Sequence, residues 1–405
     1  MIISKIAFRN IFRHKRRSAL TATMMAGGCF LFAIFIGMID GSYDNLIEMF
    51  TRDRTGHIQV HSKGYLDKPS IYKTIDEPES AGDTIKTLDH VLSWAPRVYT
   101  PALAFAGKKT TGIKVTGIDP EREGMTTRLK NKIDRGRFIS ETPRNEIVIS
   151  KGLSGNLKAG IGDEIAIIAQ GVDGSIANDL FTVSGITGKG SGSFGSSVCY
   201  MHIKTAQEFL GLPGSVHEIA VVLTDHARTD GTVGLIKNAL KDLSLDVEPW
   251  QDVESQFYRA MKADIKGNRY AIMVFTIIIA VGVLNTVLMI ILERTREFGV
   301  MKALGTRPFQ IFMLILLETA FLSVFSIIIG IITGILANWY LAVYGIAFST
   351  PIEYGGYFFD RLTAKITLKS LVMPAVIIFG TAVFVSVWPA LRAARIVPVK
   401  AIRSN

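Results

Sequence analysis

The sequence has little charge and almost no cysteine. Of its 405 residues, 20% are charged, which is below the share of about 25% in typical soluble domains. The two cysteines, Cys29 and Cys199, lie in an apolar run and in a polar region, respectively. They are poorly placed to pair with each other. The sequence therefore offers neither a disulfide framework nor the cysteine spacing of a metal site.

The sequence also lacks signatures of catalysis and of nucleotide binding. Residues 188–195 are glycine-rich and basic, but Gly190 and Val183 stand where a phosphate-binding loop needs a hydroxyl residue and a glycine. His57 and His61 lie in an expected strand, where they would be about 13 Å apart, too far for one metal ion. We expect both histidines to be exposed. No candidate catalytic, cofactor-binding or metal-binding residues are predicted.

Four long apolar runs account for the hydrophobic share of 48%. A helix needs about 20 apolar residues to cross the hydrocarbon core of a membrane. The sequence predicts such helices at residues 19–39, 270–292, 311–343 and 371–391. The first run has a basic flank like that of a signal peptide. Because it is long and no clean cleavage site follows it, we expect an uncleaved signal anchor.

Lysine and arginine residues beside these runs predict how the chain is oriented. Basic residues are concentrated in residues 1–18, 293–310 and 392–405, whereas the loop at residues 344–370 holds few of them, offset by acidic residues. With four spans, all three basic segments lie on one side of the membrane, which the positive-inside rule assigns to the cytoplasm. Topology then explains the net charge of +10, and we expect no binding of nucleic acid.

Residues 40–269, between the first and second spans, are predicted to form an outer domain. Short β-type runs and segments with helical spacing alternate there, which predicts an α+β domain in two lobes. Residues 40–55 and 250–268 are expected to continue the neighbouring spans as helical stalks, the alternative being amphipathic segments on the membrane surface. Strands are expected at residues 57–61, 113–117, 146–150, 163–168, 181–186 and 218–223, and helices at residues 152–157, 205–210 and 231–243.

The loop after the second span, residues 293–308, is short, charged and prone to form a helix. It combines an apolar stripe with flanking charges and a glycine that stops the helix. This pattern predicts a small amphipathic helix on the cytoplasmic face. It is either an ordinary interfacial loop or a helix that docks into a groove of a cytoplasmic partner. The candidate residues are Arg294, Arg296, Glu297, Phe298, Met301, Lys302, Leu304 and Gly305.

The third span contains one acidic residue, Glu318, about two turns from its cytoplasmic end. A buried charge is costly in a membrane, and the sequence shows no partner at membrane depth that would indicate a proton relay. We expect Glu318 to pack against or cap a neighbouring helix. Gly330 and Gly334 in the same span are spaced as a pair of small residues that permits close contact between helices.

The segment RTREFGVMKALG, residues 294–305, resembles the coupling segment of ATP-binding-cassette permeases of the macrolide-exporter and lipoprotein-releasing superfamily. The similarity extends over the whole chain. It includes residues 7–18, 56–65, 116–120, 160–163 and 389–402, together with Glu318, Gly330 and Gly334.

This resemblance implies an α-helical membrane protein with four transmembrane helices and an α+β periplasmic domain inserted between the first and second helices. It implies a multi-pass protein of the inner membrane in which two permeases, identical or paralogous, pair with each other. Cytoplasmic ATPase subunits would dock on the coupling helices and bind ATP and Mg²⁺, so that this chain is non-catalytic and holds no cofactor. The stalks would pass motion to the outer domains, which push cargo rather than carry it through a channel.

The leading functional prediction follows from the resemblance and from the lack of an ATPase domain fused to these residues. It is a permease that extracts lipid-anchored lipoproteins from the inner membrane and hands them to a periplasmic carrier. One alternative is efflux of peptides or hydrophobic toxins through an adaptor. Another is a signalling subunit that activates a periplasmic hydrolase.

Overall fold

The computed structural model describes residues 2–13, 15–188, 197–354 and 357–397. Within these ranges, four helices are long and apolar enough to cross a membrane. The chain divides into a membrane unit, residues 1–44, 262–347 and 361–405, and an outer unit, residues 45–261 and 348–360. The four long helices are α2 (Lys15–Phe50), α9 (Ser255–Glu293), α11 (Pro308–Tyr344) and α12 (Leu368–Ala394).

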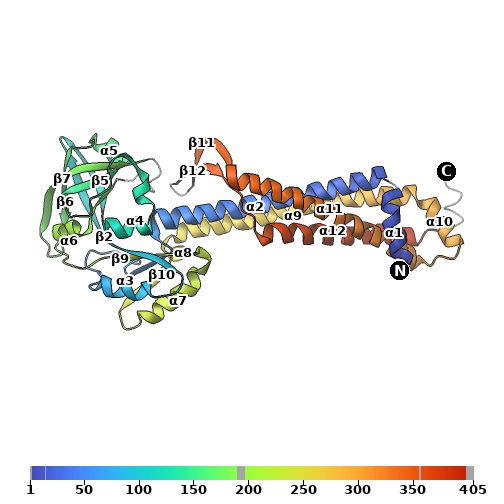
Figure 1. The fold of residues 1–405 in the computed structure, drawn as a ribbon, viewed down its shortest axis with the longest axis horizontal. Helices are drawn as coiled ribbons and strands as arrows, with labels where there is room; N and C mark the ends of the chain where they lie inside the picture. The colour runs from blue at the N-terminus through green and yellow to red at the C-terminus, as the bar shows by residue number, and fades with distance from the viewer. Residues whose placement is uncertain (1, 14, 189–196, 355–356, 398–405) are drawn as a thin grey trace. The chain divides into compact units, whose positions relative to one another are not determined.

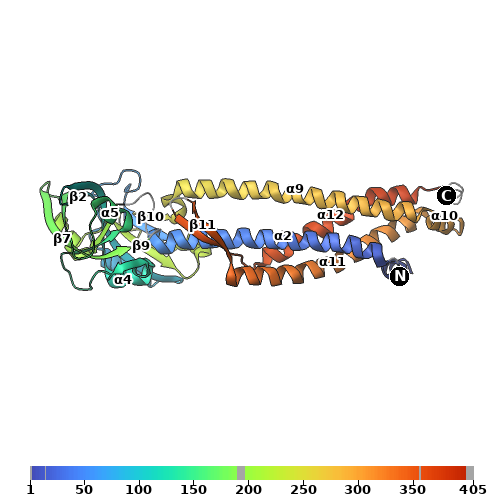
Figure 2. The ribbon, with the colours of Figure 1, turned by 90° about the horizontal axis from the view of Figure 1, so that it is seen from above.

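The membrane unit is a bundle in which these helices run lengthwise beside one another (Figures 1 and 2). Small side chains face the inside of the bundle, as Ser326 and Ala382 are both 0% exposed. Large apolar side chains such as Ile278 and Phe384 are 61% and 81% exposed. This distribution is expected in lipid, where close packing of small residues rather than hydrophobic burial holds helices together.

Local sequence signals set the ends of several helices in the membrane unit. Pro308 begins α11, and the Arg307 backbone N–H donates to Gln310 Oε1 at 2.9 Å. At the start of α12, the Ser370 backbone N–H donates to Thr367 Oγ1 at 3.0 Å, which satisfies a group that the helix itself leaves unpaired. Two shorter helices belong to this unit, α1 (Ile2–Arg13) and α10 (Thr295–Ala303).

Helices α2 and α9 extend beyond the predicted spans and contribute residues to both units. In the outer unit, α2 passes into a π-helical turn, η1 (Thr51–Thr55), and Gly56 ends it with a φ of +74°. The left-handed backbone at this position favours glycine. The Phe50 and Phe257 rings stack with their centres 3.8 Å apart, so the end of α2 and the start of α9 pack against each other.

The outer unit is built on one continuous ladder of ten strands. Its order is β10-β1-β9-β2-β3-β8-β5-β7-β4, and β6 pairs with β2 and β7. The strands are β1 (Ile58–Ser62), β2 (Val91–Ala106), β3 (Lys109–Ile118), β4 (Ile133–Gly136), β5 (Glu146–Ser150), β6 (Glu164–Gln170), β7 (Ile176–Thr187), β8 (Val198–His202), β9 (Glu218–Leu223) and β10 (Leu245–Pro249). The helices are α3 (Pro78–Lys86), α4 (Pro120–Thr126), α5 (Lys151–Leu157), α6 (Ile203–Leu210), α7 (Thr229–Ala239) and α8 (Trp250–Val253).

Strand β2 links two groups of elements within this unit. Its first part pairs with β9, and its second part pairs with β3 and β6. Figure 1 shows α3, α7, β9 and β10 gathered on one side of β2, and α5, β5, β6 and β7 on the other. One hydrophobic core cluster includes residues of both groups, with Ile58 and Ile147 each 0% exposed, and a smaller cluster contains Ile118 and Val148. The two groups correspond to the two expected lobes, but they share the larger cluster.

The six predicted strands overlap β1, β3, β5, β6, β7 and β9, and the three predicted helices overlap α5, α6 and α7. Strands β2, β4, β8 and β10 were not among the predicted strands. Strand β2 contains Pro96 and Pro101, although proline is usually excluded from paired strands. Residues 344–370 were expected to be a loop, yet they contain β11 (Ile346–Tyr354) and β12 (Tyr357–Leu362). Of the glycine-rich segment, residues 189–195 lie outside the described residues.

The expectation that His57 and His61 are exposed is wrong. Both side chains are 1% exposed. The Leu223 backbone N–H donates to His57 Nδ1 at 2.9 Å, and His61 Nδ1 lies 3.0 Å from the His217 carbonyl oxygen. Their backbone partners lie 166 and 156 residues away in the sequence, so sequence alone could not reveal this burial.

Candidate functional site

The loop between α9 and α11 forms helix α10, as the amphipathic pattern predicts. It lies at the end of the membrane unit where α1 lies (Figure 1). The helix ends at Ala303, and the Thr306 backbone N–H donates to the Met301 carbonyl at 3.0 Å. Gly305 makes the turn with a φ of +94°, a conformation that favours glycine. The left-handed turn explains why a glycine stands at the position where the sequence predicted the end of the helix.

Arg294 joins α10 to α11 through two carboxylates. Its side chain is 5% exposed. Arg294 Nε donates to Glu297 Oε2 at 2.8 Å, and Nη1 donates to Glu318 Oε2 at 2.9 Å. Burial lowers the pKa of Arg294, but the charges and hydrogen bonds of Glu318 and Glu297 outweigh that effect and raise it above its usual value. Glu318 thus has a partner from the loop, which inspection of the spans alone could not identify.

Lys302 ties the other end of α10 to the C-terminus of α12. Its Nζ donates to the carbonyl oxygens of Ala394 and Ile396, both at 2.8 Å. A helix leaves its last carbonyls unpaired and carries partial negative charge there, so a lysine at this place is doubly favourable. Helix α10 and the residue before it are therefore held against both α11 and α12.

The predicted apolar stripe of α10 is divided between two environments. Phe298 is 0% exposed and belongs to the core of the membrane unit, and Met301 is half-buried. Leu304 is 82% exposed and Val300 is 44% exposed. Arg296 is also exposed. Phe298 therefore holds α10 in place, while the surface open to a partner is formed by the other face and by the C-terminal end.

Gly330 and Gly334 lie against α2. A Cβ atom at Gly330 would be 2.6 Å from Cys29 Cβ, and one at Gly334 would be 2.7 Å from Ala33 Cβ. Neither distance leaves room for a side chain. Asn338, about one turn further along α11, is 0% exposed and donates from Nδ2 to the Ala33 carbonyl at 2.9 Å. The sequence analysis missed Asn338, whose signal was an amide within an apolar run.

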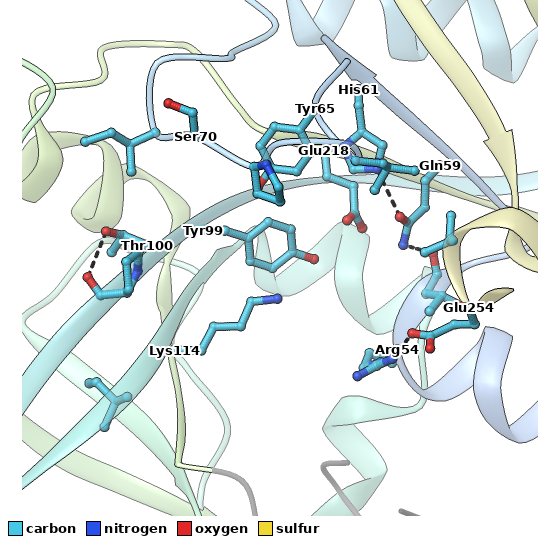
Figure 3. Close-up of a pocket in the computed structure, with 17 residues that line it drawn as sticks. Arg54, Gln59, His61, Tyr65, Ser70, Tyr99, Thr100, Lys114, Glu218 and Glu254 are labelled. Atoms are coloured by element: carbon cyan, nitrogen blue, oxygen red, sulfur yellow. Dashed lines mark hydrogen bonds and ion pairs between the residues drawn. The ribbon is translucent and has the colours of Figure 1, made fainter. Parts of the chain in front are cut away.

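The outer unit holds a cavity of about 670 Å³, here called the outer pocket (Figure 3). Its walls come from η1, β1, β2, β3, β9, the end of α8 and the segment after β1. Its size lies within the range of about 300 to 1,000 Å³ that is usual for small-molecule sites. Because its residues come from segments far apart in the chain, no local pattern predicted this pocket. Its polar and aromatic lining includes Arg54, Gln59, His61, Tyr65, Tyr99, Lys114, Glu218 and Glu254.

A buried ion cluster supports one side of the outer pocket. Arg97 Nη1 donates to Glu218 Oε1 at 2.8 Å. Arg97 Nε and Nη2 donate to the two oxygens of Glu123 at 3.0 and 2.8 Å. The three side chains are 3–5% exposed. A buried pair needs this density of hydrogen bonds to offset the loss of solvation. The described residues include no cluster of side chains able to hold a metal ion.

Comparison with known proteins gives the family. Residues 18–239, more than half of the chain, match the MacB-like periplasmic core domain, and residues 270–398 match the FtsX-like permease C-terminal domain. The chain belongs to the MacB- and Lol-type family of ABC transporter permeases. The family prediction and the predicted fold class are both confirmed. This permease is a multi-pass membrane protein whose periplasmic domain lies between the first and second transmembrane helices.

The permease is similar to proteins of lipoprotein release and of macrolide export. It is 24% identical to the lipoprotein-releasing system transmembrane protein LolC of Neisseria meningitidis serogroup B over 328 residues, 77% of this chain and 78% of LolC. It is 34% identical over 122 residues to the macrolide export ATP-binding/permease protein MacB of Chlorobium luteolum, 30% of this chain and 16% of that protein. The periplasmic region of MacB from Actinobacillus actinomycetemcomitans aligns with 51% of this chain and 95% of that structure, at 14% identity and a TM-score of 0.37.

Proposed function

We propose that this permease extracts lipoproteins from the inner membrane and hands them to a periplasmic carrier. The observation that carries the proposal is the extent of the similarity to LolC, which covers both the periplasmic domain and transmembrane helices. MacB- and Lol-type permeases work with a cytoplasmic ABC ATPase. In the proposal, a separate ATPase chain binds ATP and Mg²⁺, and two permeases, identical or paralogous, form the membrane part. This chain itself is non-catalytic.

The contacts of α10 support a role in receiving force from the ATPase. Arg294 ties the start of this helix to Glu318 on α11, and Lys302 ties its end to α12. A displacement of α10 would therefore act on two transmembrane helices at once. Helices α2 and α9 each run without a break from the membrane unit into the outer unit. They would pass this motion to the periplasmic domain, which pushes the cargo.

The test is release of lipoproteins from proteoliposomes. The permease is reconstituted with its ATPase, its second permease subunit and a lipid-anchored lipoprotein, and ATP is added in the presence of a soluble carrier. We expect the lipoprotein to move to the soluble fraction with ATP, and to stay in the membrane with a non-hydrolysable analogue. Retention of the lipoprotein despite normal ATP hydrolysis would overturn the proposal.

Efflux through an adaptor is the second candidate, because the segment shared with MacB has the higher identity, 34%. The same preparation distinguishes the two. If the function is efflux, a peptide or hydrophobic toxin stimulates ATP hydrolysis while a lipoprotein does not. If the permease only signals, ATP hydrolysis activates a periplasmic hydrolase and moves neither cargo.

A further inference from the structure

Lys114 and Tyr65 each bring to the outer pocket a hydrogen-bond donor that has no protein acceptor in the part of the chain that the structure describes. Among the described residues, neither Lys114 Nζ on β3 nor the Tyr65 hydroxyl after β1 has a hydrogen-bond or ion-pair partner. The Lys114 side chain lies beside the Tyr99 ring (Figure 3). The distance from Lys114 Nζ to the ring centre is 3.9 Å. The Tyr65 ring stacks on the His61 ring at 4.8 Å. Both side chains are thus held by aromatic contacts, while their polar ends stay available.

The other charged groups of the outer pocket already have partners. Glu218 accepts a hydrogen bond from Arg97 at 2.8 Å. Arg54 forms an ion pair with Glu254. Lys114 is therefore the charged group of the lining that a ligand can engage without breaking an existing ion pair.

The side chains of Gln59 and His61 in the outer pocket also have partners. Gln59 Oε1 lies 3.0 Å from His61 Nε2, and Gln59 Nε2 donates to the Thr55 carbonyl at 2.8 Å. The rest of the wall is apolar or aromatic and includes Leu66, Pro69, Ile71, Pro101 and Val253. An apolar cavity with a few convergent polar groups is the usual form of a small-molecule site.

We propose that the outer pocket binds a small amphiphilic carboxylate. Its apolar body lies against the rings of Tyr65 and Tyr99, and its carboxylate accepts hydrogen bonds from Lys114 Nζ. A charge-assisted hydrogen bond to an ammonium group is stronger than one between neutral groups, and more so where water is partly excluded. This inference concerns the periplasmic domain alone and does not depend on which cargo the permease moves.

The surroundings of Lys114 agree with an anion site. Burial by the pocket walls lowers the pKa of Lys114 to about 8, an effect that Glu218 opposes and that Arg54 and Arg97 reinforce. The side chain still reaches solvent through the pocket. At pH 7 the ammonium form predominates, and a bound carboxylate would restore part of the stabilisation that burial removes.

The experiment uses the full chain in lipid nanodiscs and three probes of nearly the same shape. They are 2-naphthoate, the neutral 2-naphthamide and the cationic 2-naphthylmethylammonium. Binding is measured at pH 7 by equilibrium dialysis, and empty nanodiscs correct for partition into lipid. We expect saturable binding of one naphthoate per chain, and at least about tenfold weaker binding of the amide and the cation.

Matched variants identify the group responsible. Lys114→Met should weaken naphthoate binding about tenfold or more, and Lys114→Arg should keep it within a few-fold. Lys109→Met is the control, because Lys109 lies on the same strand, is half-buried and does not line the outer pocket. Leu66→Trp, which fills part of the pocket, should weaken binding of all three probes together.

Three results would overturn the proposal. They are equal affinity for the three probes or preference for the cation, unchanged naphthoate binding by a folded Lys114→Met variant, and no saturable binding above that of empty nanodiscs. If Lys114→Met does not fold, the probe series on the unmodified chain and the Leu66→Trp variant decide the question.

Discussion

Two buried arginines in this permease are each held by two carboxylates. Arg294 bonds Glu297 and Glu318, and Arg97 bonds Glu123 and Glu218. Burying a charge costs several kcal/mol unless hydrogen bonds replace the lost water. Removing one partner from such a group costs more stability than the pair contributes, because a charge is left unpaired. The effect of a substitution therefore depends on how buried the lost partner was.

Glu318→Gln and Glu297→Gln test this at α10. Both carboxylates accept from Arg294, but the Glu318 side chain is 16% exposed and that of Glu297 is 44% exposed. We expect Glu318→Gln to lower stability by about 3 kcal/mol, and Glu297→Gln by less than about 1 kcal/mol, because solvent screens the exposed pair. The measurement is the thermal unfolding midpoint of the purified protein. Equal effects would show that burial does not control this network.

The outer pocket should bind anions in a pH-dependent way. Because the pKa of Lys114 is about 8, its positive charge is present at pH 7 and is lost as the pH rises through 8. Affinity for naphthoate should fall several-fold between pH 7 and 9, with little change for naphthamide.

The groups facing Lys114 are Arg54 on η1, Arg97 and Tyr99 on β2, Glu218 on β9 and Tyr65 after β1. Burial raises the pKa of both tyrosines well above this range. An equal loss of affinity for naphthoate and for naphthamide would contradict the role of Lys114.

At the scale of elements, glycine spacing sets how closely α11 approaches α2. Gly330 and Gly334 face Cys29 and Ala33 at distances that allow no Cβ atom. The buried amide of Asn338 then bonds the α2 backbone further along the same face. Close approach between helices and a hydrogen bond in an apolar surrounding both favour a fixed contact.

Gly330→Ala should destabilise this contact, whereas Gly380→Ala should not. Gly380 lies in α12 with nothing within 4 Å of an added Cβ, so it is a matched control within a transmembrane helix. We expect a loss of about 1–3 kcal/mol for Gly330→Ala from overpacking. Resistance to thermal unfolding in detergent reports the difference. If both variants unfold alike, α11 and α2 do not need this close approach.

At the scale of the whole molecule, α10 is the part of the chain that combines internal anchors with an open surface. Arg294, Phe298 and Lys302 hold it to the rest of the membrane unit, while Leu304 is 82% exposed. Variants of the anchors would alter folding and ATPase binding together. Substitution of an exposed apolar residue changes ATPase binding without changing folding, because it leaves the internal packing intact.

Leu304→Ser should reduce binding of the ATPase and leave the permease fold unchanged. We expect the amount of ATPase that copurifies to fall at least about fivefold, since loss of a buried leucine from an interface costs about 1–3 kcal/mol. Leu235→Ser is the control, because Leu235 is 47% exposed and lies on α7 of the periplasmic domain. Undiminished copurification with Leu304→Ser would argue against docking at this end of α10.

Local sequence patterns were sufficient to predict the four spans, the inserted domain and the existence of α10. These features depend on the length of apolar runs, on strand and helix periodicity and on a stop at Gly305, all of which are local. The six predicted strands could be found for the same reason, because their β-type patterns are also local. Helix α10 could be placed, but its faces could not be assigned, because an apolar stripe does not reveal whether its residues face the same chain or a partner.

The contacts between side chains could be seen only in the folded chain. Glu318 and Arg294 are 24 residues apart, and Lys302 reaches a carbonyl 92 residues away. Strand β2 forms despite Pro96 and Pro101, because long-range pairing with β9, β3 and β6 outweighs local propensity. The outer pocket collects residues from seven segments. Such contacts depend on how distant segments fold against one another, and no local pattern in the chain encodes them.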